Sequence, residues 1–560
     1  MAKKTYQMNK IPLLWVLKRC RRRIPGILLM TVAHVGEALL SVFFAVGMQA
    51  VIDSAVAGQK AVFYSACLQQ GGLIVAMLLC LTLFRHLRDR LSADLERDWK
   101  KQLLHGLLHG EYAAVSGFHS AELLNRLNND VARVNEGLLQ IVPGAAAMAA
   151  KLIAAVIVLG TMDLSFMVVI LLLGGLMIVA TGTMRRYLKQ INKKVNEHDG
   201  RVSGFLQEVM EKLLMVQAMD VTEEVEHRAD GLLEDRYVLH RKRKNLSLLA
   251  NTGISILSLG LGFIALVWCS FRVLLGAMTF GTLSAVIHLV SQLRLPMMNI
   301  SGLLPKYAVL LASAERLMEL ESIQGEPIAA REDVPALYDA MQTIGAKGLC
   351  FAYDQEQVIK DAEFSLRKGE FAVITGHSGI GKSTLLKLML AVYPPHAGEL
   401  FLQGEFGQLK LDRSTRRLFA YVPQGNLLLS GTLRENIMIA NPQATEEQLH
   451  RAVHVSDVES FLPLLPKGMD TVLGEDGAGI SEGQAQRIAI ARAVLGGAPI
   501  LLLDECTSAL DEETEKIVLQ RLRALPGRTC IAVTHRPAAL ELCDRIIHIK
   551  DGAICVLEPK

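Results

Sequence analysis

Six long apolar runs in the first half of the chain constrain its fold more than any other feature. They lie near residues 24–48, 61–84, 138–161, 164–184, 246–273 and 278–293. Each run is long enough, or nearly so, for the roughly 20 residues that a helix needs to cross a bilayer. The mean hydropathy of +0.31 is also high for a soluble protein of this length. We therefore expect six membrane-spanning helices, followed by a soluble part.

Basic residues beside these runs gather on one side of the expected membrane. They are Arg19, Arg21, Arg22, Arg23, Arg85, Arg88, Arg90, Arg185, Arg186, Lys189, Arg241, Lys242, Arg243 and Lys244. The connections on the other side, near residues 53–60, 163 and 272–277, are short and carry few positive charges. By the positive-inside rule both chain ends are expected in the cytoplasm, in a multi-pass protein of the cell (plasma or inner) membrane. Residues 11–17 predict a helix in the membrane interface, with a plain cytosolic tail as the alternative.

A phosphate-binding pattern begins the chemistry of the second half. Residues 371–375 are an apolar strand, residues 383–390 begin a helix, and the loop between them matches G-x-x-x-x-G-K-[ST]. The matching residues are Gly376, His377, Ser378, Gly379, Ile380, Gly381, Lys382, Ser383 and Thr384. Glycines let backbone N–H groups close around the β- and γ-phosphates, helped by the positive end of the helix. Lys382 supplies a point charge, and the Ser383 hydroxyl can ligate Mg²⁺.

Two further strands end in residues that suit ATP hydrolysis. Residues 499–505 are an apolar strand ending in Asp504 and Glu505. Asp504 suits Mg²⁺ through water, and Glu505 can polarise a water beside the γ-phosphate. Residues 530–534 predict another strand, which delivers His535 to the same sheet edge. The alternatives are a core strand capped by solvated acids and a histidine with a structural role only.

With these motifs in order, the whole chain resembles a half-transporter of the ATP-binding cassette (ABC) superfamily, of the exporter type with fused membrane and nucleotide-binding domains. The resemblance implies ATP and Mg²⁺ as cofactors. It implies that Tyr353 stacks on adenine, and that Gln424 contacts Mg²⁺ and senses the membrane domain. Residues 471–477 resemble an exporter-specific segment near the coupling helices, and residues 122–131 resemble the first cytoplasmic extension of the family.

The resemblance also implies roles for the strand-end residues. His535 resembles the switch histidine that holds the γ-phosphate, and Glu505 occupies the position of the catalytic base. With Lys382 they form the expected catalytic set. Residues 508–511 resemble the loop that signals across the dimer, in which Asp511 is assigned to the partner's nucleotide.

The signature segment departs from the family pattern. Residues 480–484 read Ile-Ser-Glu-Gly-Gln where the family has LSGGQ. In the family this segment contacts ATP bound to the partner, which assigns Ser481, Gly483 and Gln484 to that nucleotide. Glu482 is ambiguous, because a carboxylate facing the triphosphate is repelled, whereas one at a helix start gains about 0.3–1 kcal/mol. Either two identical chains pair, the reading we prefer, or this chain pairs with a different one whose ATP site is weakened.

Two connections, near residues 85–137 and 185–245, are unusually long and keep helical apolar spacing. As pairs of continuing helices of about 25 residues each, they would project roughly 35–40 Å beyond the bilayer. Breaks near residues 115–118 and 213–216 can form tips that contact the ATPase. Ordinary solvated hairpins are the alternative.

Four ionisable residues fall inside the expected spans, namely His34, Glu37, Lys151 and His288. A charge at the bilayer centre costs about 2.5–3.5 kcal/mol on insertion scales, so each is expected to face a cavity or a partner. His34 and Glu37 are three residues apart and share a helix face. These residues are candidates for the cargo path, with a structural or interfacial role as the alternative.

Composition excludes some other classes of protein. A net charge of +3 and the lack of arginine–aromatic clusters argue against a nucleic-acid partner. The nine cysteines form no C-x-x-C pair, which argues against a zinc site or a disulfide framework. Expected partners are a second half-transporter, the lipid bilayer and an unidentified transported substrate.

The expected fold class is multidomain. An all-α six-helix transmembrane domain of the ABC exporter fold occupies residues 1–322, a linker residues 323–342, and an α/β P-loop ATPase domain residues 343–560. The expected function is ATP-driven export of an unidentified amphipathic, lipid, peptide or drug-like substrate by alternating access. The alternatives are a siderophore-like importer with the same fold, and a regulatory half of a heterodimer with low turnover.

Overall fold

The computed structural model describes residues 10–325, 334–353, 356–425, 428–474 and 479–558. It divides into two compact units. Unit 1 comprises Met1–Leu108 and His119–Ser322, and unit 2 comprises His109–Phe118 and Ile323–Lys560. The predicted domain boundaries stay predictions, and the structure places one short segment, residues 109–118, with the second unit.

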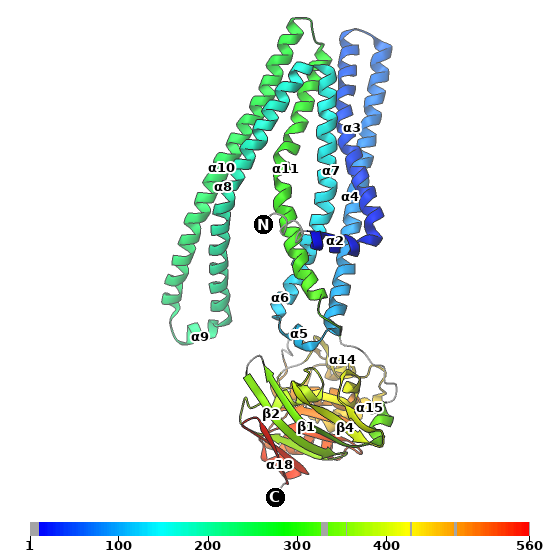
Figure 1. The fold of residues 1–560 in the computed structure, drawn as a ribbon, viewed down its shortest axis with the longest axis vertical. Helices are drawn as coiled ribbons and strands as arrows, with labels where there is room; N and C mark the ends of the chain where they lie inside the picture. Colours follow the sequence, from blue (N-terminus) through cyan, green and yellow to red (C-terminus); the bar gives the residue numbers. More distant parts are fainter. Residues whose placement is uncertain (1–9, 326–333, 354–355, 426–427, 475–478, 559–560) are drawn as a thin grey trace. The chain divides into compact units, whose positions relative to one another are not determined.

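Unit 1 is built on six long helices that follow the six apolar runs in order. They are α3 (Ile24–Val56), α4 (Lys60–His109), α7 (Val131–Met162), α8 (Leu164–Glu211), α10 (Thr222–Leu274) and α11 (Phe280–Glu321). α3, α7 and α11 pack against one another, and α8 runs along α10 (Figure 1). The shorter elements are α2 (Lys10–Arg19), η1 (Arg21–Arg23), α6 (Ser120–Asn125), η2 (Arg126–Asp130) and α9 (Leu213–Ala218).

Within the described residues, four helical segments are long and apolar enough to cross a membrane. They are Arg21–Val56, Lys60–His109, Ser120–Met162 and Thr222–Leu274. Phe280–Leu293 is a shorter apolar segment of α11. The predicted helical transmembrane domain is confirmed, whereas the count of six spans and their orientation stay predictions. The side chains of the basic residues Arg185, Arg186 and Lys189 lie outside the described set.

Two carboxylates fix the turns at one end of the unit 1 bundle. Asp163 caps α8, because its Oδ1 accepts a hydrogen bond of 3.1 Å from the backbone N–H of Phe166. Its Oδ2 lies 3.3 Å from Arg272 Nε of α10. Asp53 Oδ1 accepts a bond of 2.9 Å from the backbone of Gly281, where a Cβ atom would come within 2.6 Å of that carboxylate. Helix ends distant in sequence are thereby held together.

Unit 2 contains a six-stranded sheet in the order β12-β11-β3-β10-β9-β6. Its strands are β3 (Phe371–Thr375), β6 (Phe419–Val422), β9 (Ile500–Asp504), β10 (Thr529–Val533), β11 (Arg545–Lys550) and β12 (Ala553–Leu557). All neighbouring pairs are parallel except β11 and β12. The carboxyl ends of β3, β9 and β10 therefore meet at one edge, where parallel sheets place their ligands.

Two layers cover this sheet, and alternate residues of each buried strand point into one or the other. Leu501 and Leu503 of β9 pack with α14 (Leu433–Met438), α15 (Glu446–Val455), α16 (Glu482–Leu495) and α17 (Glu512–Arg523). Ile500 and Leu502 pack on the other side with α13 (Lys382–Met389) and a four-stranded sheet. That sheet has the order β2-β1-β4-β5, made by β1 (Met341–Tyr353), β2 (Glu356–Arg367), β4 (Ala397–Gly404) and β5 (Gly407–Lys410). The α/β class predicted for the second half is confirmed.

The short helix α5 (Tyr112–Ser116) belongs to unit 2 although it follows α4 in the chain. Its ring at Tyr112 meets Tyr393 edge-on with 5.7 Å between centroids, and the Ser116 and Tyr393 hydroxyls lie 3.4 Å apart. The backbone of Glu111 donates to Gln324 O at 3.1 Å. The first predicted tip thus contacts the ATPase fold. The second predicted break is seen as α9 in unit 1, and its contacts with an ATPase stay a prediction.

Candidate nucleotide-binding site

The loop between β3 and α13 has a backbone that only glycine adopts without strain. Gly376, Gly379 and Gly381 have φ values of 148°, 78° and 107°. A Cβ atom on Gly376 would lie 2.6 Å from Ile549 O, and one on Gly381 would lie 2.4 Å from a methyl carbon of Val358. The loop is therefore held closely against its neighbours, and α13 begins directly after it at Lys382.

The Lys382 ammonium lies inside this loop. Its Nζ donates to Gly376 O at 2.9 Å and to His377 O at 3.0 Å. The lysine is 5% exposed, so its charge acts in a medium that screens it weakly. His377, Ser378 and Gly379 are exposed at the outer side of the loop. This arrangement presents a positive charge and backbone N–H groups to an anion at the start of a helix.

Asp504 ends β9 and is 1% exposed. Its Oδ1 accepts a hydrogen bond of 2.8 Å from Ser383 Oγ, and its Oδ2 accepts one of 3.0 Å from the Tyr421 hydroxyl. Burial raises the pKa of Asp504 above its ordinary value, although Ser383 and Tyr421 act in the opposite direction. The hydroxyl of Ser383 and the carboxylate of Asp504 are hard oxygen donors, which fit Mg²⁺.

Tyr421 is a site residue for which the sequence analysis gave no role. Burial and the neighbouring Asp504 raise the pKa of its hydroxyl, so Tyr421 keeps its proton and remains a donor. The only signal in the sequence was its place three residues before Gln424. Its hydroxyl meets Asp504 because β6 and β9 are adjacent parallel strands in which Tyr421 pairs with Leu502.

Glu505 follows Asp504 and takes an unusual backbone conformation, with φ of 50°. Its backbone N–H donates to Val533 O at 3.0 Å, which anchors it to β10. Gln424 Nε2 donates to Glu505 Oε2 at 2.8 Å. His535 follows β10 at the same sheet edge and is exposed, and within the described residues no hydrogen bond of its ring is seen.

The aromatic group predicted to stack on adenine lies beside the same loop. Tyr353 is 37% exposed, and its hydroxyl accepts a hydrogen bond of 3.4 Å from Thr384 Oγ1. Its ring meets Tyr393 edge-on at 5.5 Å and Phe351 at 4.9 Å. Tyr393 was not predicted as a site residue from the sequence. Its ring contacts both Tyr353 and Tyr112 of α5. The aromatic platform and α5 are therefore linked through one side chain.

The signature segment forms the start of α16. Ser481 Oγ accepts from the Gln484 backbone at 3.3 Å, and Gln484 Oε1 accepts from the Ser481 backbone at 3.0 Å, which is a capping box. Glu482 is the first residue of the helix, where the helix dipole favours a carboxylate. A Cβ atom on Gly483 would lie 2.7 Å from Ala509 O, so the segment packs closely on the loop that holds Asp511.

A hydrogen-bond network that the sequence analysis missed ties these loops together. Gln486 Nε2 donates to Ser508 Oγ at 3.1 Å, and Gln486 Oε1 accepts from the Ala509 backbone at 3.1 Å. Arg536, next to His535, donates to Leu510 O at 3.0 Å and also to Ser508 O. Asp511 Oδ1 accepts from the Thr514 backbone at 2.9 Å and caps α17. Three segments far apart in sequence therefore form one connected surface.

The four ionisable residues of the expected spans also come together in unit 1. His34 Nδ1 lies 3.6 Å from Glu37 Oε2, and its ring stacks on Phe84. Lys151 lies on α7, which packs against α3, the helix of His34 and Glu37, and against α11, the helix of His288. His288 Nε2 lies 2.6 Å from Gln292 Nε2. The four ionisable residues therefore lie on three helices that pack against one another.

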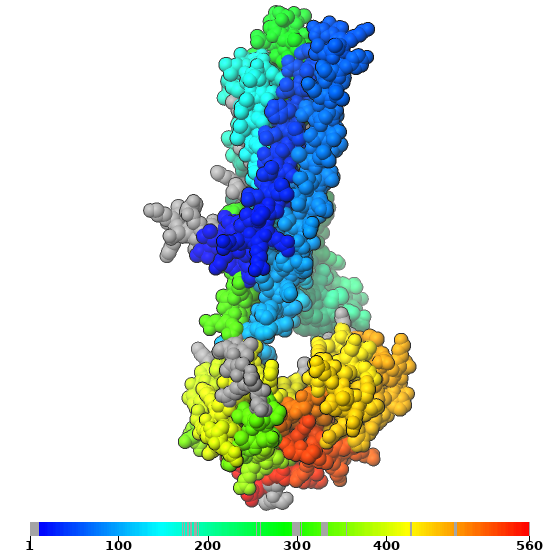
Figure 2. All heavy atoms as spheres, turned by 90° about the vertical axis from the view of Figure 1, so that its right-hand side faces the viewer, coloured from blue at the N-terminus to red at the C-terminus, as the bar shows by residue number. Residues whose placement is uncertain are grey.

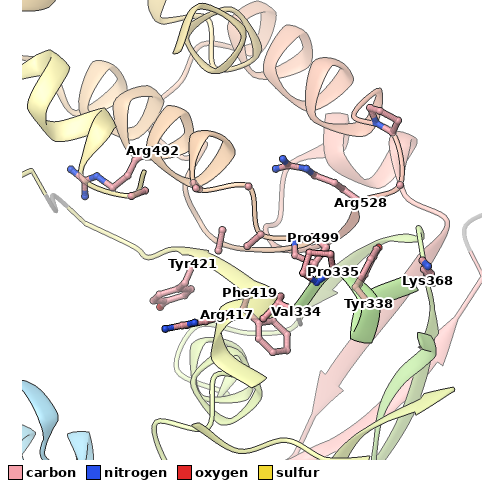
Figure 3. Close-up of a pocket in the computed structure, with 18 of the residues that line it drawn as sticks. Val334, Pro335, Tyr338, Lys368, Arg417, Phe419, Tyr421, Arg492, Pro499 and Arg528 are labelled. Carbon is pink, nitrogen blue, oxygen red and sulfur yellow. The ribbon is translucent and has the colours of Figure 1, made fainter. Parts of the chain in front are cut away.

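A hollow of about 1030 Å³ lies elsewhere in unit 2. Figure 3 shows it with Phe419, Pro499, Arg528 and Tyr338 among its labelled residues. Phe419 is the first residue of β6, Pro499 directly precedes β9, and Arg528 directly precedes β10. The hollow therefore opens at the amino ends of the strands and extends along β6 to Tyr421 and Pro423, so it reaches the residue that donates to Asp504.

Comparison with known proteins identifies both halves of the chain. Residues 24–297 match the "ABC transporter transmembrane region" family, and residues 359–508 match the "ABC transporter" family of ATP-binding domains. A probable ABC transporter ATP-binding/permease protein of Haemophilus influenzae is 36% identical over 260 residues, which is 46% of each chain. The ATP-dependent lipid A-core flippase of Syntrophus aciditrophicus is 28% identical over 77% of this chain and 72% of its own.

Two further comparisons complete the picture. The leukotoxin translocation ATP-binding protein LktB of Mannheimia glucosida is 31% identical over 63% of this chain and 50% of its own. The matched region thus spans about half the length of the Haemophilus and Mannheimia relatives. A bacterial Atm1-family ABC exporter, solved with ATP bound, shares the fold with a TM-score of 0.76 at 23% identity, over 96% of this chain and 94% of its own. An ATP-binding domain fused to the transmembrane region supports the predicted class of ATPase coupled to transport, and the chain belongs to the ABC transporter family.

Proposed function

We propose that this chain is one half of an ATP-hydrolysing exporter in the cell membrane, with both termini in the cytoplasm. One observation supports it most. A single sheet edge of unit 2 gathers the phosphate loop, Asp504, Glu505 and Gln424, and the same unit contains α5. Since α5 follows α4 directly in the chain, a change at the nucleotide can be passed to the membrane domain through this connection.

The binding roles follow from the contacts. Lys382 and the loop N–H groups hold the phosphates, and Tyr353 provides an exposed ring for adenine. Ser383 and Asp504 would hold Mg²⁺, with Gln424 as a further oxygen donor, and the ion would offset charge on the phosphates. Tyr421 orients Asp504 by a hydrogen bond.

Glu505 is the proposed general base. Its side chain reaches Gln424, and its backbone is anchored on β10, so the carboxylate has a defined position beside Asp504. A carboxylate there can take a proton from water that attacks the γ-phosphate. His535, at the end of β10, is the proposed contact of that phosphate.

The site needs a second chain. Ser481, Gly483, Gln484 and Asp511 are proposed to contact nucleotide held by the partner subunit. Glu482 supports pairing of identical chains, because at the first position of α16 its carboxylate is compatible with the helix dipole. A heterodimer in which this chain is a low-turnover regulatory half is the second possibility.

The cargo is proposed to be amphipathic, a lipid, a peptide or a drug-like compound. Two relatives are named for translocating a toxin and for flipping lipid A-core, which supports export of large amphipathic molecules. The group of His34, Glu37, Lys151 and His288 is the candidate path, because it combines charge with aromatic side chains. Siderophore-like import stays the alternative, and uptake of cargo into inside-out vesicles on addition of ATP would distinguish export from it.

The proposal is tested with Glu505→Gln in the purified full chain. The variant is expected to retain ATP binding and ATP-dependent dimerisation and to lose at least about 100-fold in phosphate release, as expected for removal of a general base. Glu513→Gln is a matched control, since Glu513 is exposed in the first turn of α17. Undiminished phosphate release by Glu505→Gln would remove the proposed base. Full turnover by a strictly monomeric sample would remove the shared site.

A further inference from the structure

A basic hollow of about 900 Å³ lies in unit 1 beside the start of the first long helix. Its walls come from the end of α2, from η1, from residues 95–106 of α4 and from the end of α11. The charged side chains of its lining are five cations, Arg19, Arg22, Arg23, Arg97 and Lys101, and two acids, Asp98 and Glu321. In Figure 2 the dark-blue segment that contains α2 and η1 lies against the blue column of α4.

The two acids of the hollow are already paired. Asp98 lies 3.2 Å from Arg23 and 3.0 Å from Arg97. Glu321 pairs with Arg19 and also accepts a hydrogen bond from an indole N–H. The Arg23–Asp98 pair joins η1 to α4 and the Arg19–Glu321 pair joins α2 to α11, so two of the hollow's own cations help to fix its shape.

Arg22 and Lys101 are the remaining two cations of the lining. Both are exposed, and across the described ranges neither has a carboxylate within ion-pair distance. They come from different elements, η1 and α4, and line the same hollow. Two cations that line one hollow without a counter-charge attract an anion with oxygen acceptors.

The position of α2 indicates at which level of the membrane this hollow lies. Ile11, Leu14 and Leu17 lie along one side of the helix and are 59%, 62% and 40% exposed, whereas Val16 is fully buried. An amphipathic helix of this kind lies in the membrane interface with its apolar side toward the acyl chains. Trp15 of α2 meets Trp99 of α4 edge-on at 5.3 Å, and such rings are enriched at that level. The hollow borders α2 and therefore lies where lipid head groups lie.

We propose that this hollow binds the phosphate of an anionic phospholipid, with Arg22 and Lys101 as its ligands. The apolar side of α2 then lies beside the acyl chains of the same lipid. Basic pockets between helices at a membrane surface bind anionic head groups in this way. Free phosphate shares the head-group chemistry but gains nothing from Ile11, Leu14 and Leu17.

The test uses tryptophan fluorescence of the full chain in bilayers. Trp15 and Trp99 line the hollow or its rim, and Trp268→Phe removes the one other tryptophan of the chain. Bilayers of mixed phosphatidylglycerol and phosphatidylcholine are prepared with bromine on the acyl chains of one lipid or of the other, at equal mole fraction. Quenching is expected to be stronger when phosphatidylglycerol carries the bromine, because that lipid is enriched at the hollow.

The variant Arg22→Gln/Lys101→Gln is expected to lose this selectivity, by about fivefold for each cation removed. The matched control is Arg90→Gln/Lys100→Gln, which removes the same charge from α4 outside the hollow and is expected to keep the selectivity. Equal loss of lipid selectivity in both variants would show that the general surface charge attracts phosphatidylglycerol, and it would overturn the proposal. So would displacement of phosphatidylglycerol from detergent-solubilised protein by millimolar inorganic phosphate. The assay needs no ATP turnover, so its result is independent of the proposed export.

Discussion

The nucleotide edge of unit 2 and the ionisable residues of unit 1 both place charged side chains at least partly inside the protein, but they hold them differently. Lys382 and Asp504 each have two partners at 2.8–3.0 Å. In unit 1 the closest approach of His34 to Glu37 is 3.6 Å. Among the described residues His34 Nδ1 and Gln292 Oε1 are buried without a hydrogen-bond partner.

This contrast in hydrogen bonding fits different roles for the two regions. Buried polar atoms with complete partners keep one geometry, as a chemical step requires. Buried atoms with incomplete partners are costly, by about 1–3 kcal/mol each, and can gain partners when a ligand or a helix movement supplies them. We therefore expect site variants in unit 2 to act on the ATPase reaction or on the protonation of a buried group, and variants of the ionisable residues of unit 1 to act on stability and cargo.

Of the three variants that test this comparison, Tyr421→Phe is expected to have the largest effect, because it removes the hydrogen bond to Asp504 and leaves the ring in place. The Mg²⁺ concentration for half-maximal ATP hydrolysis should rise about tenfold, as is typical when a residue behind a metal ligand is lost. ATP binding without Mg²⁺ should stay unchanged. If the Mg²⁺ dependence of hydrolysis is the same as in the parent chain, Tyr421 does not position Asp504.

A smaller effect is expected for Asp504→Asn. It concerns the thermal stability of the chain, measured without nucleotide or Mg²⁺. The folded-state pKa of Asp504 is raised, so the folded chain binds its proton more tightly than the unfolded chain does. Stability therefore falls as the pH rises from the ordinary aspartate pKa through the raised one. Near neutral pH the variant should unfold a few degrees higher than the parent. Thermal unfolding at acidic and neutral pH measures this, and a lower midpoint at neutral pH would contradict it.

The smallest effect is expected in unit 1, for the pair Glu37 and Lys151. Glu37→Gln and Lys151→Met each leave the other residue without its opposite charge, whereas the double variant removes both. A double-mutant cycle of thermal stability in a fixed detergent should give a coupling of about 1 kcal/mol. If the effects of the two single variants on stability simply add, the charges of Glu37 and Lys151 do not interact.

The strands of unit 2 could be predicted because their signals are local. The phosphate loop needs glycines at fixed spacing, and a strand that ends in Asp504 and Glu505 is apolar on both faces. Gln486 and Arg536 gave no such signal, since their partners at residues 508–510 lie 22 to 28 positions away in sequence. Tyr421 likewise had no local signal, because only the pairing of β6 with β9 brings it to Asp504.

Local sequence patterns were enough to predict that the first half is helical and apolar and that the second half is a phosphate-binding α/β domain, and to name the side chains expected to carry its chemistry. These features depend on hydrophobic period and on spacing within a few residues of the chain. Long-range packing, by contrast, places Tyr421 against Asp504, Gln486 against Ser508, and Arg22 and Lys101 in the lining of one hollow. Contacts between separate helices depend on how their faces pack, and no local pattern in a single chain records that packing.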